Sequence, residues 1–199
     1  MSTILYEEPG SMAGELPSAP PFDTGWFFFL AALTLDAILF VTFAGCFFVL
    51  RGSAVAWPPA DLRLQRGLVG SSTISLLLAT VLLSVTVLAQ NRNALQWMRA
   101  SLIMSLIFLT AFLCLNGFEW NNLFATGLPI RTIFGGLYFV LTGLFHVHIA
   151  LGILYVVNKY RWTLHWRHYT RSSASIARLS YFMDAMFLLW IGIYAVIYL

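Results

Sequence analysis

Two histidines, His146 and His148, lie in the apolar segment TGLFHVHIALGILYVV, where imidazole groups could bind a metal or a haem. If this segment is a helix, residues two apart project about 200° from each other, because each residue turns 100°. The two rings therefore cannot bind one metal together. A haem held from both sides would need a histidine from a second apolar segment, and no other such segment contains one. We expect no metal site, and we expect the rings to face different partners.

Asp36 is a carboxyl group deep inside another apolar segment, LTLDAILFVTFAGCFFVLR. It lies about 11 residues into that segment, which is roughly 16 Å along a helix. A carboxylate at this depth in a bilayer costs on the order of 3 kcal/mol, so it needs a partner, a proton or a wet cavity. Because no Lys or Arg lies at similar depth, we expect a largely neutral acid. Its role stays open between a hydrogen bond across a helix interface and proton handling.

Two further acids and two cysteines border or interrupt the apolar segments. Glu119, in LNGFEWNNL, is expected at the membrane interface and partly in water. Asp184 follows Arg178 closely enough to predict an ion pair within helix packing, or contact with water. Cys46 and Cys114 have no CxxC or Cys/His spacing, so they are interpreted as small apolar packing residues.

The elements that position these residues are predicted to be membrane spans. The chain is 60% hydrophobic and 10% charged, whereas soluble domains carry about a quarter charged residues. Each apolar run is long enough, at 1.5 Å per residue, to cross roughly 30 Å of hydrocarbon. The runs lie at about 25–50, 67–90, 98–118, 132–157 and 178–199. We predict an all-α membrane domain of five transmembrane helices over residues 24–199, preceded by a disordered or extended tail over residues 1–23.

The positive charges between the runs predict the orientation of the chain. A cytoplasmic N-terminus places seven basic residues on the inner side: Arg92, Arg99, Lys159, Arg161, Arg167, Arg171 and Arg178. The outer side then holds four: Arg51, Arg63, Arg66 and Arg131. This favours an inner N-terminus and an outer C-terminus, and the net charge of +3 is interpreted as topology rather than nucleic-acid binding. Arg51, Arg131, Trp162 and Trp166 are predicted to lie at the level of the lipid headgroups.

Five motifs follow one another in an order that resembles a known family. They are TGWFFFLAALTLDAILFVTFAGCFFVLR, WPPADLRLQRGLVGSSTISLLLA, FLCLNGFEWNNL, GGLYFVLTGLFHVHIALGILYVV and LSYFMDAMFLLWIGIYAVIYL. Over about residues 24–199 the chain resembles subunit III of the haem-copper oxidases, in the five-helix form of bacterial cytochrome c and quinol oxidases. Asp36 takes the place of the acid in the family's opening helix. Glu119 and Trp120 match its Glu-aromatic pair.

The fourth and fifth motifs also depart from the family. The family's fourth helix reads Gly-Phe-His-Gly-x-His-x-x-x-Gly, and aligning the terminal glycines puts His148 at the second histidine. Phe145 occupies the first histidine's place, with His146 shifted by one residue. In the last motif Asp184 and Trp190 fit, whereas Ser180 and Tyr181 replace the family's Trp and His.

The resemblance implies a V of two and three helices, with structural phospholipids in the cleft. It implies that this chain binds no redox cofactor, and that haem and copper lie in catalytic subunit I, beside subunit II. The chain would stabilise subunit I, support proton uptake and give dioxygen a path through lipid. Asp36 would be the acid near the cleft and the proton route. The interhelical or interface polar groups would be Glu119, His146, His148 and Asp184.

Three other functions stay open from the sequence. One is an accessory subunit of a nitric oxide reductase, where a similar fold occurs. Another is a small proton-coupled transporter using Asp36 and the histidines, but there is no inverted repeat and five spans cannot form equal halves. The third is a membrane haem protein, which the placement of both histidines on one segment argues against.

Overall fold

The computed structural model describes residues 24–54, 57, 64–127, 132–164 and 173–198 of the 199-residue chain. This part of the chain forms five α-helices. They are α1 (Thr24–Ser53), α2 (Arg66–Asn91), α3 (Leu95–Ala125), α4 (Ile133–Leu164) and α5 (Ser173–Tyr198). All five are long and apolar enough to cross a membrane. The predicted all-α fold with five membrane spans is therefore confirmed.

Two helices continue well past the ends of their apolar runs. α3 extends to Ala125 and α4 to Leu164, in each case about seven residues beyond the predicted end. Apolar side chains mark only the part of a helix that meets lipid or core, whereas backbone hydrogen bonding continues into polar turns. α3 ends where Gly127 adopts a φ of +83°, a left-handed conformation that glycine accepts without steric cost.

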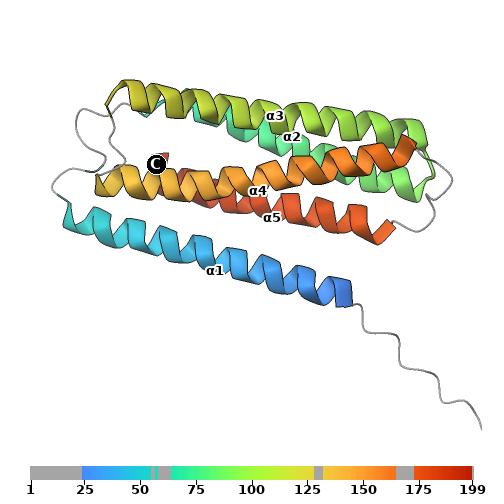
Figure 1. The fold of residues 1–199 in the computed structure, drawn as a ribbon, viewed down its shortest axis with the longest axis horizontal. Coiled ribbons are helices and arrows are strands. Elements are labelled where there is room, and N and C mark those ends of the chain that lie inside the picture. The colour runs from blue at the N-terminus through green and yellow to red at the C-terminus, as the bar shows by residue number, and fades with distance from the viewer. Residues whose placement is uncertain (1–23, 55–56, 58–63, 128–131, 165–172, 199) are drawn as a thin grey trace, which may run out of the picture.

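Helices α2 to α5 pack together as a four-helix bundle (Figure 1). α2 and α3 form an antiparallel hairpin with the most extensive contact, α5 packs on α2, and α4 packs on α3 and α5. Helix α1 lies along α4 and α5, and only Phe40 and Phe47 of α1 are buried. The predicted V of two and three helices is not confirmed, because the described helices are arranged as four plus one.

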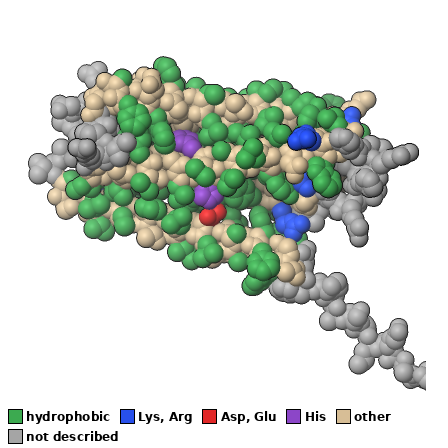
Figure 2. Space-filling model, viewed as in Figure 1, with side chains coloured by type: hydrophobic (Ala, Val, Ile, Leu, Met, Phe, Trp, Pro, Cys, Tyr) green, Lys and Arg blue, Asp and Glu red, His purple; other side chains and the backbone are tan. Residues whose placement is uncertain are grey.

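Polar and aromatic side chains join the helices of the bundle. Ser75 of α2 donates a hydrogen bond of 2.9 Å to the backbone oxygen of Phe108 in α3. Trp190 of α5 is fully buried and donates its indole N–H to Thr73 of α2 over 2.9 Å. The face of the molecule in Figure 2 carries many hydrophobic side chains and few charged ones.

Candidate functional site

An acid–histidine pair connects α1 to the bundle. Nε2 of His148, on α4, lies 3.2 Å from Oδ1 of Asp36, on α1, and it is the only ion pair within the described residues. Both side chains remain partly accessible, with 15% of His148 and 23% of Asp36 exposed. Figure 2 shows an acidic and a histidine side chain touching between the two ends of the molecule, with hydrophobic side chains nearby. The pair therefore places ionisable groups at mid-depth, open to a neighbouring molecule or lipid.

The hydrogen bonds of His148 fix how many protons the pair shares. Its Nδ1 lies 2.8 Å from the backbone oxygen of Leu144, and since a carbonyl only accepts, Nδ1 must carry a hydrogen. One further proton then lies between Nε2 and Oδ1. It belongs either to a neutral carboxylic acid donating to imidazole, or to an imidazolium donating to carboxylate. The site can thus hold one shared proton.

The structure gives Asp36 a hydrogen-bond partner on another helix, which agrees with one of the two roles left open from the sequence. The sequence reasoning looked for a charged partner of Asp36 only among Lys and Arg, and it left out histidine as a cation or acceptor. Both residues lie near the middle of their helices, so equal depth in antiparallel spans was a signal available from counting. Phe40, one turn after Asp36, holds the pair in place with its ring centroid 5.8 Å from that of His148.

His146 faces the other side of α4. Its ring centroid lies 5.1 Å from Trp120, 5.9 Å from Phe112 and 6.3 Å from Trp190. Its Nε2 is buried, with no hydrogen-bond partner in the part of the chain the structure describes. Within the same residues, no three His, Cys, Asp or Glu side chains converge as metal ligands. The two histidines thus lie in separate environments.

Glu119 is buried between helices, so the expectation that it is partly in water is wrong. Only 1% of the residue is exposed. Its Oε2 accepts a hydrogen bond of 2.8 Å from the hydroxyl of Tyr198 on α5, and that hydroxyl lies 2.9 Å from the hydroxyl of Tyr138 on α4. Glu119 is buried because both helices are long. α3 continues past it to Ala125, and α5 extends to Tyr198, whose side chain covers the carboxyl group.

Asp184 does not form the predicted ion pair with Arg178, as far as the described residues show. Six residues along a helix turn through about 600°, which leaves the two side chains roughly 120° apart.

Of the residues predicted at headgroup level, Arg51 is exposed in the last turn of α1, and Trp162 is 59% exposed near Lys159. Arg131 and Trp166 lie outside the described residues.

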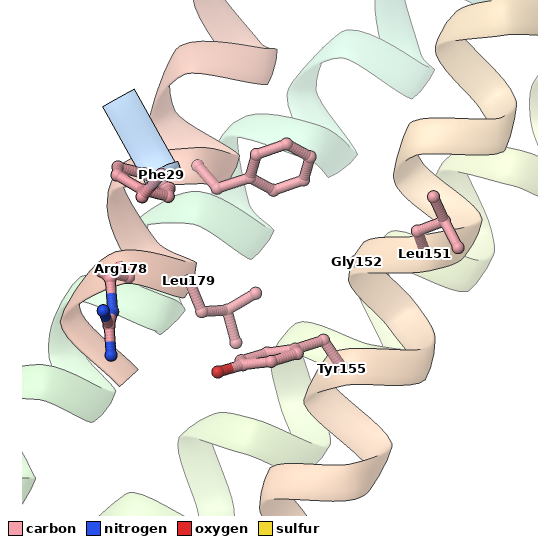
Figure 3. A pocket seen from close by; sticks show the side chains of 7 residues that line it. Phe29, Leu151, Gly152, Tyr155, Arg178 and Leu179 are labelled. Atoms are coloured by element: carbon pink, nitrogen blue, oxygen red, sulfur yellow. The ribbon is translucent and has the colours of Figure 1, made fainter. Parts of the chain in front are cut away.

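A pocket of about 310 Å³ opens between α1, α4 and α5. Figure 3 shows Tyr155 extending from α4 toward Leu179 and Arg178 on α5, with Phe29 of α1 on the same side. The other lining residues are Leu151, Gly152 and Phe182. The pocket is apolar except for the tyrosine hydroxyl and one guanidinium group, a combination that suits a hydrocarbon chain with an anionic end.

Comparison with known proteins finds two oxidase subunits that are similar to the chain over most of its length. No family model matches the chain. Over 185 residues it is 26% identical to the cytochrome bo(3) ubiquinol oxidase subunit 3 of Pseudomonas putida, a match that covers 87% of this chain and 83% of that protein. Over 168 residues it is 23% identical to the probable cytochrome c oxidase subunit 3 of Nocardia farcinica (strain IFM 10152), covering 83% of each chain. Both matches extend over most of a chain with five membrane-spanning helices. These matches support a place for the chain in the haem-copper oxidase subunit III family.

The chain is an integral membrane protein with five membrane-spanning helices, and the names of its relatives indicate a multisubunit respiratory oxidase. Sequence reasoning missed three parts of its polar architecture: the link between Asp36 and His148, the tyrosines around Glu119, and the pocket beside Arg178. Tyr138 and Tyr198 lie at the ends of apolar runs, where a tyrosine is usually interpreted as a headgroup residue. Only the packing of α4 and α5 against α3 turns their hydroxyls inward.

Proposed function

We propose that this chain is the non-catalytic subunit III of a respiratory haem-copper terminal oxidase. That complex reduces dioxygen and couples the reaction to proton translocation. The chain binds beside catalytic subunit I, together with subunit II, and the partner subunits hold haem and copper. The names of its relatives and the length of the matches support this assignment.

The observation that carries a specific role is the Asp36–His148 pair. A pair that shares one proton at mid-depth, with both side chains partly exposed, can exchange that proton with a neighbouring subunit. Helix α1 leaves nearly all of its surface uncovered by the rest of the chain, so it offers a broad face to subunit I or to lipid. We assign the pair to supporting proton uptake by subunit I and stabilising it during turnover.

The pocket between α1, α4 and α5 is proposed to hold a structural phospholipid. An acyl chain fits among Phe29, Leu151 and Phe182, and the phosphate lies at Arg178. Lipid at this position fills the space between α1 and the bundle, and it provides an apolar route for dioxygen. The favourable contact between phosphate and guanidinium is the kind that arginine makes best.

The orientation that follows from the charge distribution is part of the proposal. The chain lies in a bacterial cytoplasmic membrane, with its N-terminus in the cytoplasm and its C-terminus outside. Alkaline phosphatase and green fluorescent protein fused to the C-terminus test this. An active phosphatase with a dark fluorescent fusion supports the orientation, and the reverse contradicts it.

Co-purification tests the assignment as a whole. The tagged chain is extracted from native membranes in a mild detergent, the accompanying chains are identified by mass spectrometry, and a reduced-minus-oxidised spectrum is recorded. A haem-copper catalytic subunit in stoichiometric amount, with haem bands and dioxygen uptake, supports the proposal. A nitric oxide reductase as the partner, or a haem-free chain purifying alone, overturns it.

A further inference from the structure

The carboxyl group of Glu119 has two oxygens in very different situations. Oε2 accepts the hydroxyl hydrogen of Tyr198 over 2.8 Å. Oε1 is buried and has no hydrogen-bond partner within the described residues. Leaving a buried polar atom unsatisfied costs about 1–3 kcal/mol, so this oxygen calls for an explanation.

The hydroxyl groups around Glu119 point in one direction. Tyr198 has a single hydroxyl hydrogen, and it is used on Glu119 because a carboxyl oxygen in this position accepts. Tyr138 must therefore donate its own hydrogen to the Tyr198 oxygen, 2.9 Å away. With the carboxyl accepting at Oε2, both hydroxyl hydrogens point toward it. Oε1, which has no hydrogen-bond partner within the described residues, is then the oxygen left to carry a proton.

Donors face this carboxyl from each helix packed against it, whereas no cation pairs with it within the described residues. Tyr198 comes from α5 and Tyr138 from α4, and the backbone amide of Gln65, at the start of α2, also faces the carboxyl. On α3 itself, Asn116 lies one turn earlier and donates its amide to the backbone oxygen of Phe112. The one ion pair among the described residues is elsewhere, at Asp36.

A second buried polar atom without a partner lies at the same end of the bundle. The indole nitrogen of Trp57 has no acceptor within the described residues. Its ring packs 5.1 Å from Phe134, which in turn stacks on Tyr138 at 6.1 Å. Buried polar atoms without a protein partner, such as this donor and Oε1 of Glu119, are the groups to which an internal water molecule bonds.

We infer that Glu119 forms an internal proton-binding site, separate from the Asp36–His148 pair. Glu119 carries a proton on Oε1 and donates it to an internal water molecule at this end of the bundle. Release breaks the Oε1–H bond and passes the proton to that water, and the carboxylate left behind keeps its hydrogen bond from Tyr198. Uptake is the reverse. The ligand class of this site is a proton with its water, and the tyrosine pair keeps the carboxyl in place in both states.

Infrared difference spectroscopy of the purified full-length chain tests this site. The chain is studied in whatever complex it is isolated, so the result does not depend on the oxidase assignment. Subtracting the spectrum of Glu119→Gln from that of the wild type isolates the carbonyl band of this one acid. Tyr198→Phe serves as a second variant that keeps the acid, and Asp184→Asn is the control for an unrelated carboxyl group.

The expected result has three parts. First, one protonated-acid band is lost in Glu119→Gln and retained in Asp184→Asn. Second, this band is shifted in Tyr198→Phe. Third, it moves to lower frequency when the folded protein is placed in heavy water. Three results would overturn the inference. They are the absence of such a band, a band whose frequency does not change in heavy water until the protein unfolds, and a band that Tyr198→Phe leaves unchanged. If Glu119→Gln does not fold, the Tyr198→Phe shift and the heavy-water shift still decide the question.

Discussion

His148 and Asp36 bring α4 and α1 together through a contact of 3.2 Å between Nε2 and Oδ1. Helix α1 has only two buried side chains, Phe40 and Phe47, and this polar contact adds to the aromatic contacts that join α1 to the bundle. Because Nδ1 of His148 already donates to the backbone of Leu144, the pair shares one proton in either charge arrangement. The same contact therefore serves both the attachment of α1 and the proposed proton exchange.

A double-mutant cycle measures this contact. Asp36→Asn and His148→Gln each disturb the contact between the two side chains. Each single change leaves the polar atom of the remaining partner without its usual hydrogen bond. Residues in direct contact show coupling of about 0.5–3 kcal/mol, so the double variant should be less destabilised than the sum of the singles. The measurement is thermal unfolding in one detergent. Thr42→Ala is a control on the same helix, since the Thr42 hydroxyl donates to the backbone oxygen of Ile38 within α1. Strictly additive effects would contradict the contact.

The tyrosine over Glu119 is expected to matter for stability. Tyr198→Phe removes the donor to Oε2 and leaves a buried acceptor unpaired, at a cost of about 1–3 kcal/mol. Tyr194→Phe is the matched control, because Tyr194 stacks on Tyr198 but makes no hydrogen bond to the described residues. Thermal unfolding should show a lower midpoint for Tyr198→Phe only. Equal midpoints for the two variants would contradict the assigned hydrogen bond.

Gly152 marks the close approach of α4 and α5. A Cβ atom at this position would lie 2.8 Å from the Met183 sulfur, so alanine must displace that side chain. At Gly192 a Cβ atom meets nothing within 4 Å, and there alanine should gain up to about 1 kcal/mol of helix propensity. Gly152→Ala is therefore expected to unfold at a lower temperature than Gly192→Ala. The reverse order would show that α4 and α5 pack less tightly than described.

Arg178 is expected to retain phospholipid in the pocket. Arg178→Ala removes the cation that lines it, so fewer phospholipids should remain with the purified protein. Arg92→Ala removes the same charge from an exposed connection between α2 and α3 and serves as the control. Native mass spectrometry counts the lipids in each preparation. Equal retention by both variants would argue against a lipid phosphate at Arg178.

The five helices were predictable, because long apolar runs have few alternatives in a chain with so little charge. The pairing of Asp36 with His148 was within reach, since both residues lie near the middle of antiparallel spans. The projection of His146 and His148 to different sides of α4 also follows from the turn of 100° per residue. These features depend on position along a single helix or on depth in the membrane.

Features that depend on how helices pack were not predictable. The environment of Glu119 requires α5 to end where Tyr198 reaches α3. No local sequence pattern predicts this relative position of the two helices along their axes. The placement of α1 along α4 and α5, in place of a two-plus-three V, is likewise a property of tertiary contacts. The pocket beside Arg178 requires three helices at once. Apolar composition specifies that helices associate, but it leaves open which faces meet.

The most direct measurement of the proposed role is the course of dioxygen consumption by the oxidase complex carrying Asp36→Ala. Thr34→Ala is the control, because Thr34 is exposed on the same helix and bonds only the Leu30 backbone. The Asp36→Ala complex is expected to assemble with full haem content but to take up protons more slowly, or to lose activity within fewer turnovers than the control. Turnover, proton uptake and catalytic lifetime indistinguishable from the control would contradict it.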